Sequence, residues 1–226
     1  TNPVATLFAW TGALRKRGEL DGIQALMDCA FQNDADIAIG GYVCQDAAGN
    51  VTPGKTYSAG PVTDRERIPG MTCGKAFRRR SWAKLQFPLG YWYEDSVISQ
   101  ILLPMARRIY AIDAPVFAYL LNPLGVSAAS QGRPKSLESL YVTRRLLKER
   151  EFFGLRYDQD AYTHFLHMVL LTYHRTRLLS KPASLRRTAK SQARGPAQTM
   201  WVTLGSFASR SKLMSYSQVV SLLLVW

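Results

Sequence analysis

The stretch at residues 36–43, DIAIGGYV, is the clearest indication of the fold class of this chain. It is short, apolar and partly β-branched, which is typical of a strand. Ahead of it, residues 19–32 repeat apolar side chains at helical spacing and predict an amphipathic helix, although Gly22 weakens its first turn. Behind it, residues 46–50, DAAGN, supply turn residues. Helix, strand and turn in this order indicate an α/β layer. The apolar face of the helix is expected to contain Leu20, Ile23, Met27, Ala30 and Phe31.

The middle of the chain continues this alternation. Residues 52–70 are rich in Pro, Gly and polar side chains, which predicts a long surface loop. Residues 97–105 carry a helical stripe of apolar side chains, and we expect Pro104 to kink or end that helix. Residues 109–121 read as extended, with a break at Asp113-Ala-Pro115 that predicts two short strand pieces.

The last third of the chain is expected to be helical. One helix is predicted from Ser136, a candidate N-cap, to about Glu151, with Glu138 in the favourable first turn. A second helix fits residues 160–179. A basic segment at residues 181–194 and an apolar tail ending in SLLLVW follow it.

The composition indicates a globular protein with an excess of positive charge. The 226 residues have 47% hydrophobic content, enough for one large domain or a domain with an appendage. Lysine and arginine number 29 against 16 acids, so the net charge of +13 favours an anionic partner: nucleic acid, a phosphorylated substrate or an anionic lipid surface. Residues 161–226 hold nine basic residues and no acid, so the basic character lies mostly in the C-terminal third.

The cysteines and the hydropathy pattern favour a cytoplasmic protein. Cys29, Cys44 and Cys73 are widely spaced without a CxxC pair, which argues against a disulfide framework or a zinc knuckle. No secretory signal opens the chain, and no apolar run reaches the ~20 residues that span a bilayer.

Two adjacent carboxylates stand out in residues 87–96, FPLGYWYEDS, where Glu94 and Asp95 follow three consecutive aromatic residues. Acids at the start of a helix have a simple structural explanation, because they interact favourably with the helix dipole. The surrounding order suggests more. Residues 73–82, CGKAFRRRSW, come first, then FPLG, then the acid pair, then an apolar helix and an extended segment containing Tyr119.

This order resembles the C-terminal half of the catalytic domain of family 2 glycosyltransferases, which have the GT-A fold. In that family a segment of the type K-L-Y/F-R-R precedes F-P-x-G and x-E-D. The matching stretches here are Lys75-Ala-Phe77-Arg78-Arg79, Phe87-Pro88-Leu89-Gly90 and Tyr93-Glu94-Asp95. Ala35-Asp36-Ile37 also looks like the A-D-I-V strand of the family. The resemblance covers about residues 19–150.

The resemblance implies an inverting transfer of a sugar, with Asp95 as the general base and Glu94 beside it. Such a base must reach the acceptor hydroxyl directly, and two like charges this close raise the pKa of one partner. Lys75, Arg78, Trp92 and Tyr93 are the expected substrate-binding residues. In this interpretation the arginines at 78–80 bind a phosphate, and in the alternative they form a solvated basic loop. Lys75 either contributes to the site or only stabilises the fold.

The donor-binding half of the family domain is not recognisable. The complete family enzyme uses Mg²⁺ or Mn²⁺ on the donor diphosphate, held by an Asp-x-Asp motif that follows a strand. Residues 1–18 show no match to it, and Asp34-Ala-Asp36 precedes the strand instead. No cofactor site is identifiable in this chain. His164, His167 and His174 lie on one predicted helix stripe, but the ~10 Å of helix rise between the last two is too long for one zinc.

The expectation is therefore an α/β chain with two parts. Residues 1–150 form a partial GT-A (Rossmann-like) glycosyltransferase domain without its donor half, and residues 151–226 form a helical segment with a basic tail. Its partners would be a nucleotide-sugar donor and a saccharide or lipid-linked acceptor in polysaccharide or glycolipid synthesis. Residues 181–226 would contact the inner face of the cell membrane peripherally or be disordered. The alternative is a non-catalytic module that binds saccharide or an anionic surface, and a nucleic-acid-binding protein is the least favoured.

Overall fold

A computed structural model describes residues 19–123, 125, 130 and 132–176. Two compact units divide the chain, one containing residues 1–87 and 102–125, the other residues 88–101 and 126–226. We call them the sheet unit and the helical unit. Residue 150, where the sequence places the boundary between the two parts, lies inside a helix, α4 (Glu138–Phe152). The predicted basic tail at residues 181–226 lies outside the described residues.

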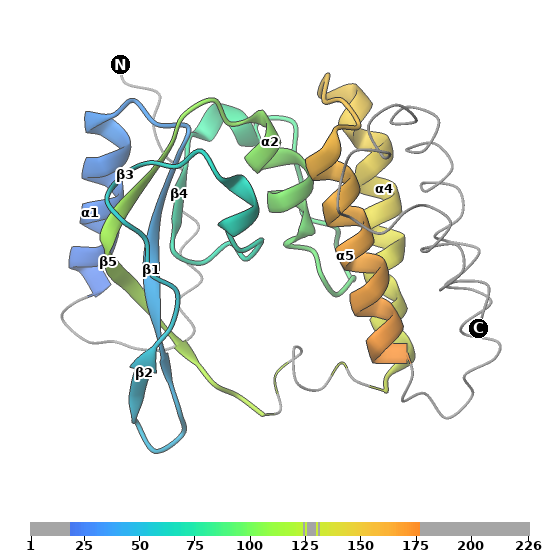
Figure 1. Ribbon diagram of the computed structural model, residues 1–226, viewed down its shortest axis with the longest axis horizontal. Coiled ribbons are helices and arrows are strands. Elements are labelled where there is room, and N and C mark those ends of the chain that lie inside the picture. Colours follow the sequence, from blue (N-terminus) through green and yellow to red (C-terminus); the bar gives the residue numbers. More distant parts are fainter. Residues whose placement is uncertain (1–18, 124, 126–129, 131, 177–226) are drawn as a thin grey trace. The chain divides into compact units, whose positions relative to one another are not determined.

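The sheet unit is a mixed α/β layer, which confirms the predicted fold class (Figure 1). Strands β1 (Ile37–Gln45) and β5 (Ile109–Leu120) pair in parallel at its centre. On the side of β1 away from β5, β1 pairs antiparallel with β2 (Val51–Pro53) and β4 (Lys75–Phe77). On the side of β5 away from β1, β3 (Gly60–Pro61) pairs antiparallel with β5. The predicted loop at 52–70 is therefore interrupted by short strand pairings and by the 3-10 helix η1 (Arg65–Arg67).

The predicted break at Asp113-Ala-Pro115 is an irregularity within one strand. Opposite Gly41 the register of β1 and β5 shifts, so that Ile39 pairs with Ala111 and Gly41 with Pro115. Because proline cannot donate to the ladder, the irregularity accommodates it without ending β5. The prediction of two separate strand pieces was wrong, although it located the irregularity correctly.

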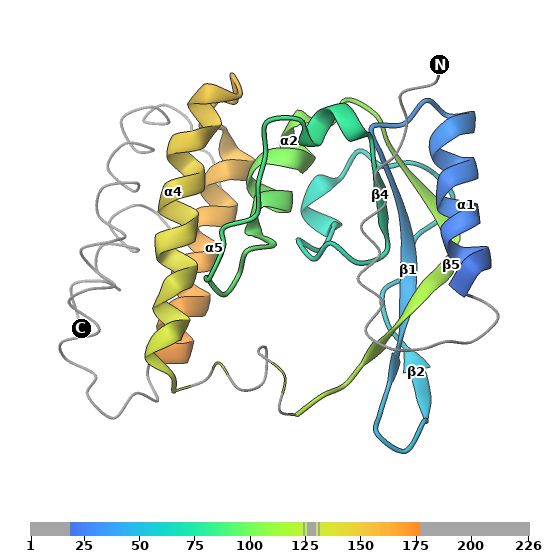
Figure 2. The same ribbon diagram turned by 180° about the vertical axis from the view of Figure 1, so that it is seen from behind.

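Helix α1 (Glu19–Gln32) occupies the predicted range and packs on the sheet, as both views show (Figures 1 and 2). Its buried positions include Leu26, Cys29 and Ala30, whereas Phe31 is 44% exposed, so the predicted apolar face is partly wrong. Gly22 has a packing role, because a Cβ there would lie 2.8 Å from the carbonyl oxygen of Val116. The close approach of α1 to β5 therefore needs the glycine that weakens the helix.

The helical unit is built on α4 and α5 (Gln159–Thr176), which lie side by side (Figure 2). Their antiparallel pairing follows from two contacts: the Tyr157 hydroxyl donates to the Leu147 carbonyl, and Ser139 hydrogen-bonds Thr172 near the other end. A shared apolar core lies between them, formed by Leu140, Leu147, Ala161, Tyr162, Phe165, Leu166 and Val169. Both predicted helices are present. α5 begins one residue before the expected start, and its predicted end at residue 179 lies outside the described residues.

The start of α4 differs from the prediction. Ser136 lies inside a 3-10 helix, η4 (Pro134–Leu137), where it is fully buried and donates to the Ser130 carbonyl. It is therefore not an N-cap, and Leu137 holds the position before α4. Glu138 is in the first turn as predicted.

The helix after the acid pair starts at Ser96 and contains a π-helical turn, η3 (Ile98–Leu102), followed by α2 (Leu103–Met105). The helix ends one residue after Pro104, as expected from the ring at that position. Within the described part of the chain, no helix is long and apolar enough to cross a membrane. Within the described residues, none of Cys29, Cys44 and Cys73 forms a disulfide bond.

Candidate functional site

The acidic loop, residues 91–95, lies in the helical unit and leads directly into the buried helix that begins at Ser96. Tyr93 adopts a left-handed backbone conformation with φ of 67°, which turns the chain sharply before the acids. The amide of Ser96 donates to the Tyr93 carbonyl at 3.1 Å, and the amide of Ile98 donates to the Asp95 carbonyl at 2.9 Å. Asp95 thus stands at the amino end of the helix, where the dipole favours a negative charge.

The two carboxylates differ in exposure. Glu94 is exposed, whereas Asp95 is half-buried and Ser96, the next residue, is buried. Asp95 is therefore the more enclosed of the two acids, and Glu94 faces solvent beside it.

Tyr91 and Trp92 tie the acidic loop to the start of α4. The rings of Tyr91 and Tyr141 stack with their centroids 5.1 Å apart. The backbone amide of Trp92 donates to the Glu138 carboxylate at 2.6 Å, and the Lys135 ammonium lies 5.5 Å from the centre of the Trp92 ring. A charge-assisted hydrogen bond contributes about 1.5 to 3 kcal/mol, so Glu138 is the principal anchor of this part of the loop.

Tyr93 ties the loop to α5. The guanidinium of Arg175 stacks on the Tyr93 ring, 4.6 Å from its centre. Among the described residues, the Tyr93 hydroxyl and one terminal nitrogen of Arg175 are buried without a hydrogen-bond partner. Buried polar atoms of this kind are usually satisfied by water or a ligand. The aromatic residues that the sequence placed ahead of the acids therefore hold the loop in position.

A buried arginine supports the helix behind the acids. Arg150 on α4 is only 1% exposed and donates to the carbonyl of Gln100, within the π-helical turn, at 2.7 Å. It also donates to the Arg156 carbonyl and lies 3.5 Å from Asp158. Burial lowers the pKa of this guanidinium, and the Asp158 charge opposes that shift. Sequence reasoning missed Arg150, because a lone arginine in a helix is ordinarily solvated.

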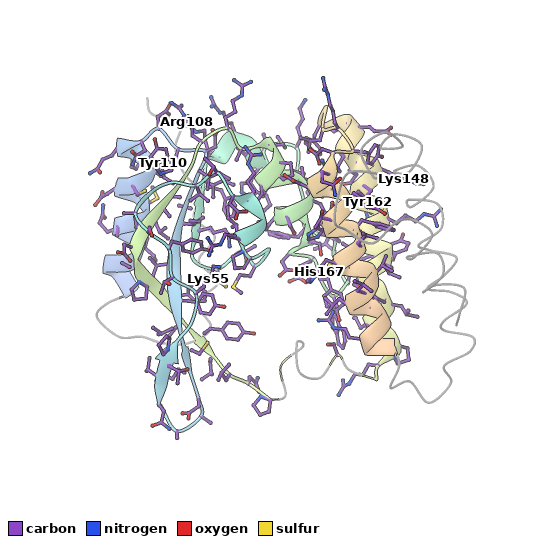
Figure 3. The ribbon with its side chains drawn as sticks, in the orientation of Figure 1. Lys55, Arg108, Tyr110, Lys148, Tyr162 and His167 are labelled. Atoms are coloured by element: carbon purple, nitrogen blue, oxygen red, sulfur yellow. The ribbon has the colours of Figure 1, made fainter. Side chains whose placement is uncertain are left out.

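Helix α5 contains three histidines, His164, His167 and His174. His167 is exposed on the surface of α5 (Figure 3), and the side chain of His174 lies outside the described residues. Burial lowers the pKa of His164 to about 4, with smaller contributions from the charges of His167 and Arg150. In the part of the chain that the structure describes, no group of three or more His, Cys, Asp or Glu side chains is arranged to hold a metal.

The other predicted site residues, Lys75 and Arg78, lie in the sheet unit. The Lys75 ammonium is buried and donates to the Met71 carbonyl at 2.6 Å. Arg78 is 9% exposed, donates to the Ala35 carbonyl and forms ion pairs with Asp34 and Asp36. These contacts connect β4 to the start of β1. These contacts of Lys75 and Arg78 therefore stabilise the fold, and the binding of substrate by either residue stays a prediction.

The Asp34-Ala-Asp36 motif is held by arginines. The Asp36 carboxylate accepts from the backbone amides of Arg107 and Arg108 and pairs with Arg78, while Asp34 pairs with Arg78 and Arg108. The hydrogen bond and charge of Arg78 and the charge of Arg108 hold the pKa of Asp34 below its usual value. Because the arginines occupy these carboxylates, they do not fit a divalent cation.

Comparison with known proteins gives little similarity. No family model and no curated protein matches the chain. Among solved structures, the crystal structure of residues 1–349 of TarS from S. aureus, a glycosyltransferase, has a TM-score of 0.35 and 12% sequence identity. The match covers 83% of this chain and 64% of that chain, so this chain spans about two thirds of the TarS structure. A likeness this low carries no argument about activity.

Proposed function

We propose that this chain is the acceptor-side part of an inverting nucleotide-sugar glycosyltransferase with a GT-A fold, belonging to family 2. The observation that carries the proposal is the half-buried Asp95 carboxylate at the start of a buried helix, on a loop anchored by three neighbouring aromatic residues. A general base needs a fixed position within hydrogen-bond reach of its proton, and this anchoring supplies it. The products would be polysaccharides or glycolipids.

In the proposed mechanism, Asp95 accepts the proton of an acceptor hydroxyl as its oxygen attacks the anomeric carbon of the donor sugar. The bond to the nucleoside diphosphate breaks on the opposite face, so the configuration inverts. Glu94, exposed beside the base, positions the acceptor through its other hydroxyl groups. General-base catalysis of this type typically contributes 10²–10⁴-fold to the rate.

Tyr93 and Trp92 are the proposed acceptor-binding residues. The Tyr93 hydroxyl is buried without a partner among the described residues, and the Arg175 guanidinium stacks on the same ring. The Trp92 ring lies beside the Lys135 ammonium. An aromatic surface with a few polar groups at its margin is the usual lining of a small-molecule site.

The complete family enzyme would bind the donor sugar together with a metal ion. Mg²⁺ or Mn²⁺ on the donor diphosphate would neutralise the leaving group, but the carboxylates of Asp34 and Asp36 are occupied by arginines. No step of the proposed mechanism therefore uses them. Lys75 and Arg78 remain predicted substrate-binding residues on the strength of the resemblance alone.

The test of the proposed function is donor turnover by the protein in its full-length form. Nucleoside diphosphate sugars labelled in the sugar would be supplied with Mn²⁺ and a panel of saccharide and lipid-linked acceptors. We expect acceptor-dependent release of the nucleoside diphosphate and a product of inverted anomeric configuration. Release without an acceptor-dependent product, or a product that retains the configuration, would contradict the proposal.

A saccharide-binding module without catalysis is the second candidate, and one observation favours it. Near the carboxyl ends of β1 and β5, the ring of Tyr42 lies 5.1 Å from Phe117 and 6.1 Å from Tyr119, which is 37% exposed. Ligands of open α/β sheets bind at this end of parallel strands. If this candidate is correct, Tyr119→Ala weakens saccharide binding in a calorimetric titration, while Asp95→Asn has no effect on binding and no transfer is detected in any variant.

A further inference from the structure

The opposite edge of the sheet unit gathers most of its arginines. At the amino ends of β1 and β5 three segments meet: the turn after β4, the residues before β5, and the 3-10 helix η1, whose Arg65 donates to the carbonyls of Pro104 and Ala106. Figure 3 shows Arg108 at this edge. We call it the arginine edge, and its arginines are Arg65, Arg67, Arg78, Arg79, Arg80, Arg107 and Arg108.

The acids at this edge do not neutralise it. Among the residues whose side chains the structure describes, it contains three acids, Asp34, Asp36 and Asp64, against seven arginines. Asp36 is 7% exposed and is engaged by Arg78 and by the backbone of the segment before β5, so it acts as an internal clamp. Within the described residues, neither Arg79 nor Arg107 has an acidic partner, and both are exposed. A net positive charge therefore faces solvent.

The arginine edge does not lie at the end of the sheet where substrates usually bind. In open α/β sheets, ligands bind outside the carboxyl ends of the parallel strands, whereas these arginines lie at the amino ends of β1 and β5. Asp36 holds the side chains of Arg78 and Arg80 and the backbone of Arg107 and Arg108, and it leaves the side chains of Arg79 and Arg107 without an ion pair among the described residues. Such a surface is suited to contact with an extended anionic partner.

One apolar side chain accompanies the charge. Phe31, in the last turn of α1, is 44% exposed, and its carbonyl accepts a hydrogen bond from the amide of Asp34 at this edge. Basic residues around an exposed aromatic ring are typical of surfaces that rest on a bilayer. Single-stranded nucleic acid needs several stacking rings, and a duplex needs an element that enters a groove, so a lipid surface fits better.

We propose that the arginine edge docks the sheet unit on an anionic membrane, with its guanidinium groups binding lipid phosphates and Phe31 entering the headgroup layer. Arginine suits this role because its planar guanidinium bonds phosphate in a bidentate manner. The inference goes beyond the proposed function and does not depend on it. It also differs from membrane contact through residues 181–226, because it assigns the contact to the folded sheet unit.

The test compares two variants of the full chain that lose the same charge. Arg79→Ala/Arg107→Ala removes the two exposed arginines without acidic partners from the arginine edge. Lys148→Ala/Arg156→Ala removes two exposed basic residues from the helical unit, where Figure 3 shows Lys148 on α4. Each basic residue near an anionic surface strengthens binding by about 1 kcal/mol, between five- and six-fold, so two account for about 30-fold.

Binding would be measured by sedimentation with vesicles of phosphatidylcholine containing 30% or no phosphatidylglycerol. We expect binding only to the anionic vesicles, a loss of about 30-fold in the arginine-edge variant, and a much smaller loss in the control. Equal losses in the two variants would show that only total charge matters and would overturn the proposal. So would competition by free inorganic phosphate or duplex DNA at the same phosphate concentration as the vesicles, because the surface would then not select a bilayer.

Discussion

Replacing Arg150 tests the support of the helix that carries the candidate base. Arg150→Met keeps most of the side-chain volume but leaves the carbonyls of Gln100 and Arg156 without their donor. An unsatisfied buried acceptor costs about 1 to 3 kcal/mol, and breaking a buried charged contact costs about 3 to 5 kcal/mol. We expect the free energy of unfolding of the helical unit to fall by about 3 to 5 kcal/mol.

The matched control is Arg145→Met on the same helix. Arg145 is exposed and pairs with Glu149 at 2.9 Å, an i,i+4 ion pair that contributes about 0.3 to 0.5 kcal/mol. Both variants would be unfolded in urea and followed by far-ultraviolet circular dichroism, with midpoints and slopes compared. If Arg150→Met loses less than about 1 kcal/mol, or no more than the control, the buried arginine does not hold the π-helical turn against α4.

Three further outcomes follow from the structure. Burial lowers the pKa of His164 from 6.5 to about 4, so the free energy of unfolding is highest above pH 6.5 and falls by up to about 3 kcal/mol as the pH drops to 4. The urea midpoint of His164→Gln should therefore depend less on pH over this range than that of the wild type, whereas His167→Gln should keep the wild-type dependence. Gly40→Ala places a methyl group into Val116 and should cost about 1 to 3 kcal/mol, with partial rescue by Val116→Ala; additive losses would refute the contact. Burial raises the pKa of Tyr57 to about 12, so Tyr57→Phe should remove a component near pH 12 from the ultraviolet titration, and loss of a component near pH 10 would contradict this.

Much of the fold was predictable because it rests on local patterns. Helix α1 occupies the range predicted from its apolar spacing, and β1 follows from a short β-branched run. The turn between β1 and β2 was also predictable, since the Asp46 carboxylate accepts from the amides of Ala48 and Asn50, as turn aspartates do.

The remaining features depend on contacts between distant residues. Phe31 belongs to the apolar pattern of α1 yet is exposed, and Gly22 weakens the helix locally but lets it approach Val116. Ser136 has the residue type and position of an N-cap, but its burial next to Ser130 uses the hydroxyl elsewhere. Tertiary contacts override local preference in each case.

In the candidate site, too, some features follow from the local sequence and others from contacts between distant residues. The adjacent acids and the helix after them follow from the sequence, but the anchors of the acidic loop do not. Trp92 reaches Glu138 and Tyr93 reaches Arg175, partners that lie far along the chain and carry no motif. The left-handed conformation of Tyr93 was equally hidden, because tyrosine is uncommon in that region.

The most direct test of the central claim, that Asp95 is the base of sugar transfer, is the transfer rate of the Asp95→Asn variant of the full-length protein. It would be measured beside Glu94→Gln, with acceptor binding and unfolding measured for both. We expect a loss of at least about 10²-fold in transfer by Asp95→Asn with acceptor binding and stability retained, and a smaller loss for Glu94→Gln. Transfer by Asp95→Asn at the wild-type rate would contradict it.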